Sequence, residues 1–134
     1  MEREEALGRL EAARQWGNRS ASAAATGVAW VSASFALVLG VIADTNLWWL
    51  VGLLILGMVG LLARVSVRGR FDWSRRSGVA LVYGGAFLAL AAYVLVQFPV
   101  RAADWVVPNT IGGATAAVVI LLICRAGLVR MARR

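Results

Sequence analysis

The chain has 134 residues, of which 60% are hydrophobic and 16% charged, and its formal net charge is +7. Soluble domains average about 45–50% apolar and 25% charged residues, so this composition favours a membrane protein over a soluble one. The basic residues stand at the ends of apolar runs rather than along one soluble face, which argues against nucleic-acid binding.

Few residues could hold a metal or a cofactor. There is one cysteine, Cys124, and no histidine. A single cysteine cannot form an intrachain disulfide, and histidine is the commonest protein ligand of haem and transition metals. We therefore expect no metal and no cofactor. All fourteen basic residues are arginine, which points to a high-GC coding bias and hence to a bacterial source.

Residues 1–20 are predicted to form a cytosolic amphipathic helix, followed by a four-transmembrane-helix domain over residues 21–134. Glutamates precede arginines along the first segment, as the helix macrodipole prefers. Leu10 lies on a thin apolar stripe with Leu7 beside it, which is too little surface for a strong membrane-surface helix. We expect this helix either to cap the bundle in water or to dock a partner. Its charge excludes a secretory signal peptide.

Four apolar runs without any Asp, Glu, Lys, Arg or His follow, at about residues 22–42, 47–63, 78–98 and 105–124. At about 1.5 Å per residue they suit a hydrocarbon core of about 30 Å, although the second run is short. The predicted fold class is all-α, an integral membrane four-helix bundle made of two antiparallel hairpins. Without ionisable residues the spans show no proton relay, which weighs against a proton-driven exporter.

Small residues recur at four-residue spacing within these runs, which lets neighbouring helices approach closely. The strongest signal is a pair of adjacent small stripes in the fourth run, and two glycines mark the third. The predicted helix-packing positions are Gly84, Gly85, Gly112, Gly113, Ala116 and Ala117.

Polar and aromatic side chains inside the runs are few. Mild hydrogen-bonding groups in membrane helices usually join neighbouring helices, and a ligand pocket is the alternative. Trp30 lies well inside the first run, away from the interfaces where tryptophan is usually found. The residues of this candidate pocket are Trp30, Tyr83, Tyr93 and Asn109.

Arginine placement predicts the orientation. Thirteen arginines lie in the amino-terminal segment, between the two hairpins and in the tail, whereas only Arg101 lies in a loop on the other face. By the positive-inside rule both termini are cytoplasmic, and the protein lies in the bacterial inner membrane. The predicted contacts to anionic lipid headgroups or to a protein partner on this face are Leu7, Leu10, Arg68, Arg70, Phe71, Trp73, Arg75 and Arg76.

Two segments carry a resemblance. They are the opening helix Glu4-Glu-Ala-Leu-Gly-Arg-Leu-Glu-Ala-Ala-Arg14 and the linker Arg68-Gly-Arg-Phe-Asp-Trp-Ser-Arg-Arg76. With its four spans, the chain resembles small four-helix bacterial membrane proteins of unassigned function. The resemblance covers the whole chain, implies no activity and carries over no functional residue.

The sequence therefore predicts a non-catalytic accessory or regulatory membrane protein, as a subunit of a complex or a homo-oligomer. A small transporter or channel for an apolar or neutral solute is the first alternative, with a cavity near Trp30 and the start of the fourth run. A membrane-embedded lipid-modifying enzyme is the second. Its acid–base groups would have to be the tyrosines, Asp44, Asp72 or Asp104.

Overall fold

A computed structural model describes residues 2–66 and 71–132, which are almost entirely helical and contain no strand. The all-α class predicted from the sequence is therefore confirmed. Arg68 and Arg70 lie outside the described residues. The elements in chain order are α1 (Glu2–Thr45), α2 (Leu50–Ser66), α3 (Arg76–Ala102), α4 (Pro108–Val119), the π-helical segment η1 (Ile120–Cys124) and α5 (Arg125–Ala132).

Three helices are long and apolar enough to cross a membrane: Arg3–Thr45, Arg76–Ala102 and Pro108–Ala132, the last being α4, η1 and α5 in one piece. The second predicted span corresponds to α2, which is a shorter apolar helix of 17 residues. At 1.5 Å per residue α2 is about 25 Å long, so it is the helix whose crossing depends most on a thin bilayer.

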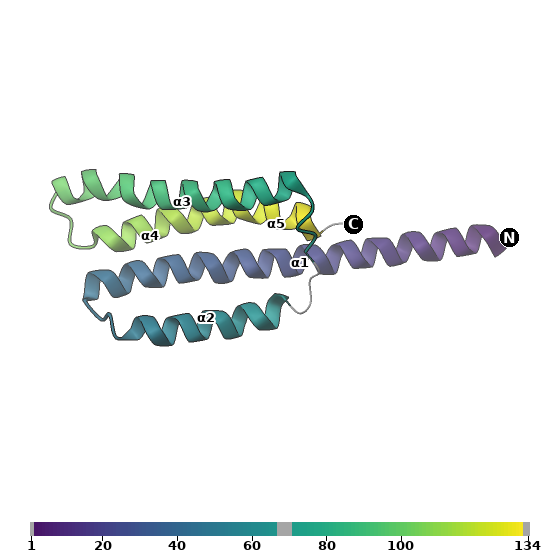
Figure 1. Ribbon diagram of the computed structural model, residues 1–134, viewed down its shortest axis with the longest axis horizontal. Helices are drawn as coiled ribbons and strands as arrows, with labels where there is room; N and C mark the ends of the chain where they lie inside the picture. Colours follow the sequence, from purple (N-terminus) through teal and green to yellow (C-terminus); the bar gives the residue numbers. More distant parts are fainter. Residues whose placement is uncertain (1, 67–70, 133–134) are drawn as a thin grey trace.

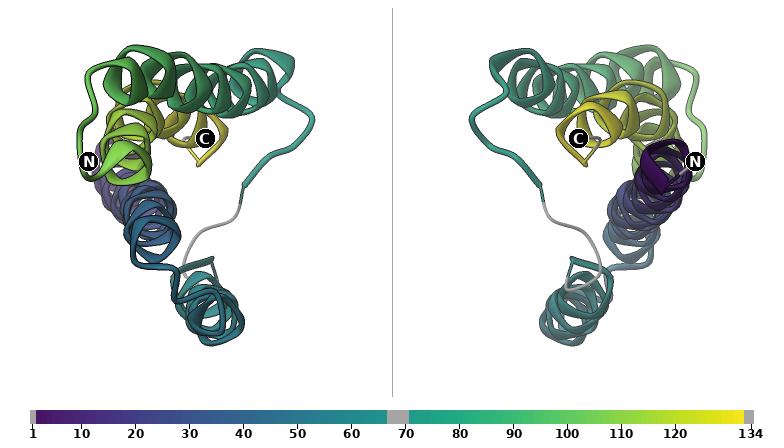
Figure 2. Two further views of the ribbon diagram at one scale, coloured as in Figure 1. Left: turned by 90° about the vertical axis from the view of Figure 1, so that its left-hand side faces the viewer. Right: turned by 90° about the vertical axis from the view of Figure 1, so that its right-hand side faces the viewer.

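The helices lie side by side in the order α3, α4 with α5, α1, α2 (Figure 1). The continuous helix from α4 to α5 contacts both α1 and α3, whereas α2 contacts α1 alone among the described elements. Viewed end on, the helices form an open, curved row rather than a closed ring (Figure 2). Both hairpin turns lie at one end, and the start of α3 and the end of α5 lie at the other (Figure 1).

The first helix does not stop where the sequence suggested a boundary near residue 20. Glu2–Thr45 is one unbroken α-helix of 44 residues, about 66 Å long at 1.5 Å per residue. No proline interrupts it. Its N-terminal part extends well beyond the other helices (Figure 1).

The second helix begins at Leu50 rather than at the predicted residue 47, because the chain forms a turn between α1 and α2 first. Asn46 adopts a left-handed conformation with φ of 58°, and the Leu47 N–H donates a hydrogen bond to the Ile42 carbonyl. These features close the first helix, so Trp48 lies in the turn rather than in α2.

The turn between α3 and α4 also differs from expectation. The third run was predicted to end at residue 98, but α3 continues past Pro99 to Ala102. A proline removes one backbone donor, here the one that would bond the Leu95 carbonyl, and α3 continues for three residues beyond it. Asp104 then adopts φ of 53°, and α4 begins at Pro108 rather than at residue 105.

Several small residues of α1 are buried. Ala25 and Ala29 are completely buried, and Gly40 is buried near the turn between α1 and α2. A Cβ placed on Gly40 would collide with the Asn109 carbonyl oxygen, so the two backbones touch there. Most bulky apolar side chains, such as that of Phe87, are exposed instead, as expected for helices surrounded by lipid.

Candidate functional site

The most extensive polar contact joins Asp44, near the end of α1, to the first turn of α4. Asp44 Oδ1 accepts hydrogen bonds from the Asn109 N–H at 3.0 Å and from Asn109 Nδ2 at 2.9 Å. Asp44 Oδ2 accepts from the Thr110 N–H and the Thr110 hydroxyl, both at 2.6 Å. A carboxylate offers about four lone-pair positions, so these four bonds use its whole accepting capacity.

The backbone of α4 explains why an acid is held there. The first N–H groups of a helix have no partner within it. Pro108 has no N–H, the side chain of Val107 makes no capping hydrogen bond, and the Ile111 N–H donates to the Val107 carbonyl. The N–H groups of Asn109 and Thr110 remain, and Asp44 accepts both. Its negative charge also suits the positive end of the helix dipole.

Two side chains of α3 complete this arrangement. The Tyr93 hydroxyl donates to Asn109 Oδ1 at 3.1 Å, and Gln97 Nε2 donates to the same oxygen at 2.9 Å. Three helices therefore meet in one hydrogen-bond network at the end of the molecule that carries the hairpin turns. The network, called the Asp44 cluster below, consists of Asp44, Tyr93, Gln97, Asn109 and Thr110.

The Asp44 cluster brings together Tyr93 and Asn109 from the candidate pocket but not the other two residues. Tyr83 is exposed on α3. Trp30 lines an apolar groove of about 370 Å³ between α1 and α2, together with Phe35 and Met58. The four residues therefore occupy three separate places rather than one pocket.

Asp44 is not free to act as a base, because its lone pairs are already occupied. Within residues 2–66 and 71–132, no group of three or more His, Cys, Asp or Glu side chains is placed to hold a metal ion. The chemistry that this geometry supports is the joining of helices.

Of the predicted packing positions, those in α4 face neighbouring helices. A Cβ on Gly113 would lie 2.6 Å from the Ala36 carbonyl oxygen of α1, and one on Gly112 would lie 2.9 Å from the Tyr93 ring of α3. Both distances are too short to admit a side chain at these positions, so α4 packs closely against both α1 and α3. The next positions along this face are also covered, since Ala116 is buried and Ala117 half-buried.

The two adjacent glycines of α3 differ from each other. A Cβ on Gly85 would lie 2.7 Å from Cys124 Sγ and 2.9 Å from the Ile123 side chain. On Gly84 a Cβ would have no neighbour within 4 Å. Cys124 is buried against this glycine, with its thiol 3.6 Å from the Val82 carbonyl oxygen.

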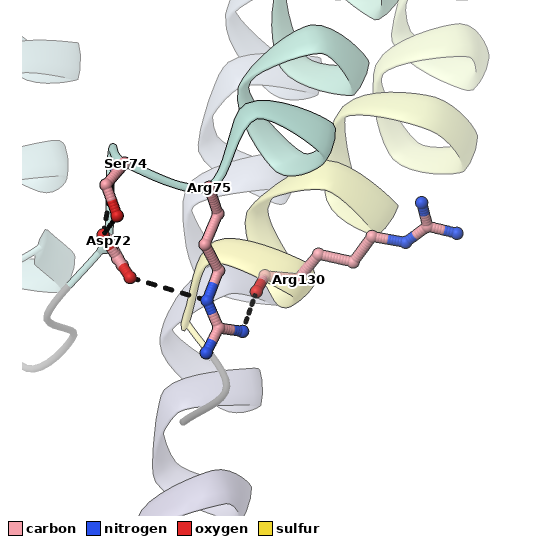
Figure 3. Close-up of polar contacts among 4 residues, drawn as sticks. All are labelled: Asp72, Ser74, Arg75 and Arg130. Carbon is pink, nitrogen blue, oxygen red and sulfur yellow. Dashed lines mark hydrogen bonds and ion pairs between the residues drawn. The ribbon is translucent and has the colours of Figure 1, made fainter.

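A second polar contact lies at the opposite end of the molecule and joins the segment before α3 to α5 (Figure 3). Arg75 Nη1 donates to the Arg130 carbonyl at 3.0 Å, and the Asp72 N–H donates to the Met131 carbonyl at 3.0 Å. The last carbonyls of a helix lack partners within it, so these two bonds cap α5. The contact, called the inner clasp below, consists of Asp72, Ser74, Arg75, Arg130 and Met131.

Asp72 orders the inner clasp through its carboxylate. The Ser74 hydroxyl and N–H donate to Asp72 Oδ1 at 2.6 and 3.0 Å, and Arg75 Nε lies 3.5 Å from Asp72 Oδ2. The hydrogen bonds from Ser74, helped by the Arg75 charge, hold the pKa of the Asp72 carboxyl below its usual value. Asp72 stays ionised at neutral pH and orients Arg75 toward α5.

The predicted cytosolic contact residues fall into two groups that lie on different elements. Leu7 and Leu10 are exposed on the projecting part of α1. Near the inner clasp, Phe71 is half-buried, and Trp73 and Arg76 are exposed. Arg75 is already engaged with α5.

Comparisons with protein-family models, with curated proteins and with solved structures found no match to this chain. The fold therefore defines the class of protein: it is all-helical, and three of its helices are able, by length and composition, to cross a membrane.

Proposed function

We propose that this protein is a non-catalytic accessory or regulatory protein of the bacterial inner membrane that recognises a protein partner through its cytosolic face. The observation that carries the proposal is the projecting part of α1, residues 2–17, called the arm below. Every side chain from residue 3 to residue 17 is exposed. The arm extends beyond all the other helices (Figure 1).

An isolated helix of this length is marginal in water, because nucleating a helix is costly. The arm avoids that cost because it continues a membrane helix that is already formed. A pre-ordered helix loses less conformational entropy when it binds, so a partner gains affinity. The arm is therefore suited to recognition.

Four spans, N-in/C-in, are the topology that we propose. Thirteen of the fourteen arginines belong to residues 1–20, 64–76 and 125–134, and the positive-inside rule assigns such arginine-rich segments to the cytoplasmic face. Attraction to anionic lipid headgroups contributes about 1 kcal/mol of binding free energy for each basic residue near the surface, so lipid contact accompanies partner recognition there.

A non-catalytic role is supported by how the polar groups of the helices are used. Asp44 and Asn109 are engaged with each other and with α3 and α4 in the Asp44 cluster. A general base needs a lone pair within reach of a substrate proton, and Asp44 has none to offer. The lipid-modifying enzyme is correspondingly the least favoured reading.

Assembly with a second membrane helix is supported by the open row. A Cβ on Gly52, Gly57 or Gly60 of α2 would have no neighbour within 4 Å. Exposed glycine on a membrane helix permits close approach of another helix. We therefore infer that the protein is a complex subunit or a homo-oligomer.

A small transporter or channel for an apolar or neutral solute is the second candidate function. The observation that favours it is the apolar groove between α1 and α2, with Trp30 and Phe35 on one wall and Met58 on the other. Its volume of about 370 Å³ is in the range of small-molecule pockets.

Deletion of residues 1–17 distinguishes the two functions. The Asp44 cluster and the inner clasp do not involve the arm, so the truncated protein should insert and melt like the full chain. We expect it to lose the protein that co-purifies with the full chain from native membranes in mild detergent. Trp30→Ala is the matched control and should retain that protein. If the truncated protein keeps its partner and phenotype while Trp30→Ala loses the phenotype, the transporter replaces the accessory role.

A further inference from the structure

The arm carries one continuous apolar stripe, called the arm stripe below, which consists of Ala6, Leu10, Ala13 and Gly17 with Leu7 beside it. The intervals of four, three and four residues keep these positions on one face of an α-helix. Leu7 is 53% exposed and Leu10 is 63% exposed. Within the described chain, then, nothing covers the arm stripe.

The charges of the arm are arranged around this stripe. At about 3.6 residues per turn, Arg3 and Arg14 lie between the stripe and Leu7, and Arg9 borders the other side of the stripe, with Glu5 one turn before Arg9. Glu4 and Glu11 lie on the opposite face. The arm as a whole is close to neutral, and arginine borders its apolar stripe on both sides.

We propose that the arm stripe docks an amphipathic helix of another protein whose apolar ridge is bordered by Asp or Glu. This inference rests on the proposed function and names the chemistry of its partner. Apolar contact around Leu10 would supply affinity, and ion pairs with Arg9 and Arg14 would select the acidic borders. The acidic face with Glu4 and Glu11 would remain in water.

The course of α1 argues against a lipid surface as the occupant. From residue 3 to residue 17 the helix rises about 21 Å, whereas the headgroup layer adds only about 5–8 Å to each side of the hydrocarbon core. α1 continues unbroken from the arm into the apolar run. To lie on lipid, the arm would have to break away from that axis.

The border charges argue against a second copy of this chain. Copies in one membrane hold their arms parallel, and the spacing places Leu10 at a coiled-coil a position and Ala13 at d. In that register Arg9 of one copy faces Arg14 of the other. Two such like-charge pairs oppose association of the arms, whereas a helix with acidic borders would satisfy both arginines.

Site-specific crosslinking tests the proposal in the full-length protein. A photoreactive amino acid replaces Leu10 on the stripe or, as the matched control, Glu11 on the opposite face. Native membranes are irradiated, and the crosslinked peptide is sequenced. We expect the Leu10 site to crosslink about ten-fold more strongly than the Glu11 site, to a peptide of another protein with an apolar ridge bordered by Asp or Glu.

A charge reversal adds a second measurement. Arg9→Glu with Arg14→Glu should lower the crosslinking yield at position 10 by about ten-fold or more, because the acidic borders would then be repelled. Glu4→Arg with Glu11→Arg changes as many charges on the far face and should leave that yield within about two-fold. The yield should also fall with added salt, since exposed ion pairs are screened.

Several outcomes would overturn the inference. They are crosslinks to a second copy, crosslinks to lipid alone, a peptide without acidic borders, equal yields at the two sites, and no crosslink at all. The inference fails alone if deletion of residues 1–17 releases the partner but the double arginine reversal does not. If the deletion leaves the partner bound, the proposed function fails with it.

Discussion

Asp44 does for α4 what an N-cap residue normally does for its own helix. Asp44, which accepts the N–H groups of Asn109 and Thr110, belongs to α1 and lies 65 residues before Asn109 in the chain. The bonds therefore satisfy the start of one helix and fix the end of another. Asn109 uses its remaining acceptor for Tyr93 and Gln97, so α3 is tied to the same point.

Removing this charge should destabilise the protein. Hydrogen bonds to a charged acceptor contribute about 1.5–3 kcal/mol each when buried, and Asp44 is half-buried, so we expect Asp44→Asn to lower the free energy of unfolding by about 2 kcal/mol. The new amide would also point an N–H group at donors on α4. Asp104→Asn is the matched control, because Asp104 is exposed in the other turn. Thermal melting in detergent measures both. Equal melting of the two variants would mean that the Asp44 cluster does not hold the helices.

Much of this site could not be read from the sequence. The apolar pattern predicted that the fourth run starts near residue 105, and Asn109 was singled out as a polar residue within that run. That Asp44 would reach them depends on how two helices are rotated and offset, which short-range patterns do not encode. The signal that was available is an acid in one turn and a helix start without its own capping side chain in the other.

At the scale of helices, composition predicted the apolar runs well and their ends less well. Apolar length depends on many residues at once, whereas a helix end depends on one or two. Asn46 and Asp104 turn the chain with positive φ, and Pro99 is tolerated in the last turn of α3. Small residues were expected at helix contacts, but of the adjacent glycines in α3 only Gly85 faces another helix. Which one does so is set by helix rotation.

The two glycine environments give a matched pair of variants. Gly113→Ile should destabilise the protein by about 1–3 kcal/mol, because its Cβ would lie 2.6 Å from the backbone carbonyl of Ala36, which cannot move aside cheaply. Gly84→Ile adds the same bulk where no atom lies within 4 Å and should melt like the unmodified protein. Thermal unfolding and size in detergent measure both. Should Gly113→Ile leave melting and size unchanged, α1 and α4 would not pack as closely as described.

For the molecule as a whole, the two ends are held by different means. At the end with the hairpin turns the Asp44 cluster joins α1, α3 and α4, and at the other end the inner clasp joins α5 to the segment before α3 (Figure 3). Between them small residues bring α4 against both neighbours. Among the described elements α2 contacts α1 alone, whereas α1, α3 and the continuous helix from α4 to α5 are joined by more contacts.

The orientation of this arrangement in the membrane is decided by whether α2 crosses. Three crossing helices would place the two termini on opposite faces, and the arginines of the arm and of the tail would then be separated by the bilayer. Four crossing helices place thirteen of the fourteen arginines on one face, which is the distribution that the positive-inside rule favours. A span of 17 residues is at the short limit for crossing but within it.

We therefore expect reporters fused after Arg134 or inserted between residues 68 and 76 to be cytoplasmic, and reporters placed after Asn46 or Arg101 to be external. The reporter after Asn46 is the decisive one, because α2 separates it from the position between residues 68 and 76. If both report the same side, α2 does not cross, and the arm and the tail cannot share a face. An external signal after Arg134 would place the arginine-rich tail outside the cell, which would contradict the positive-inside rule.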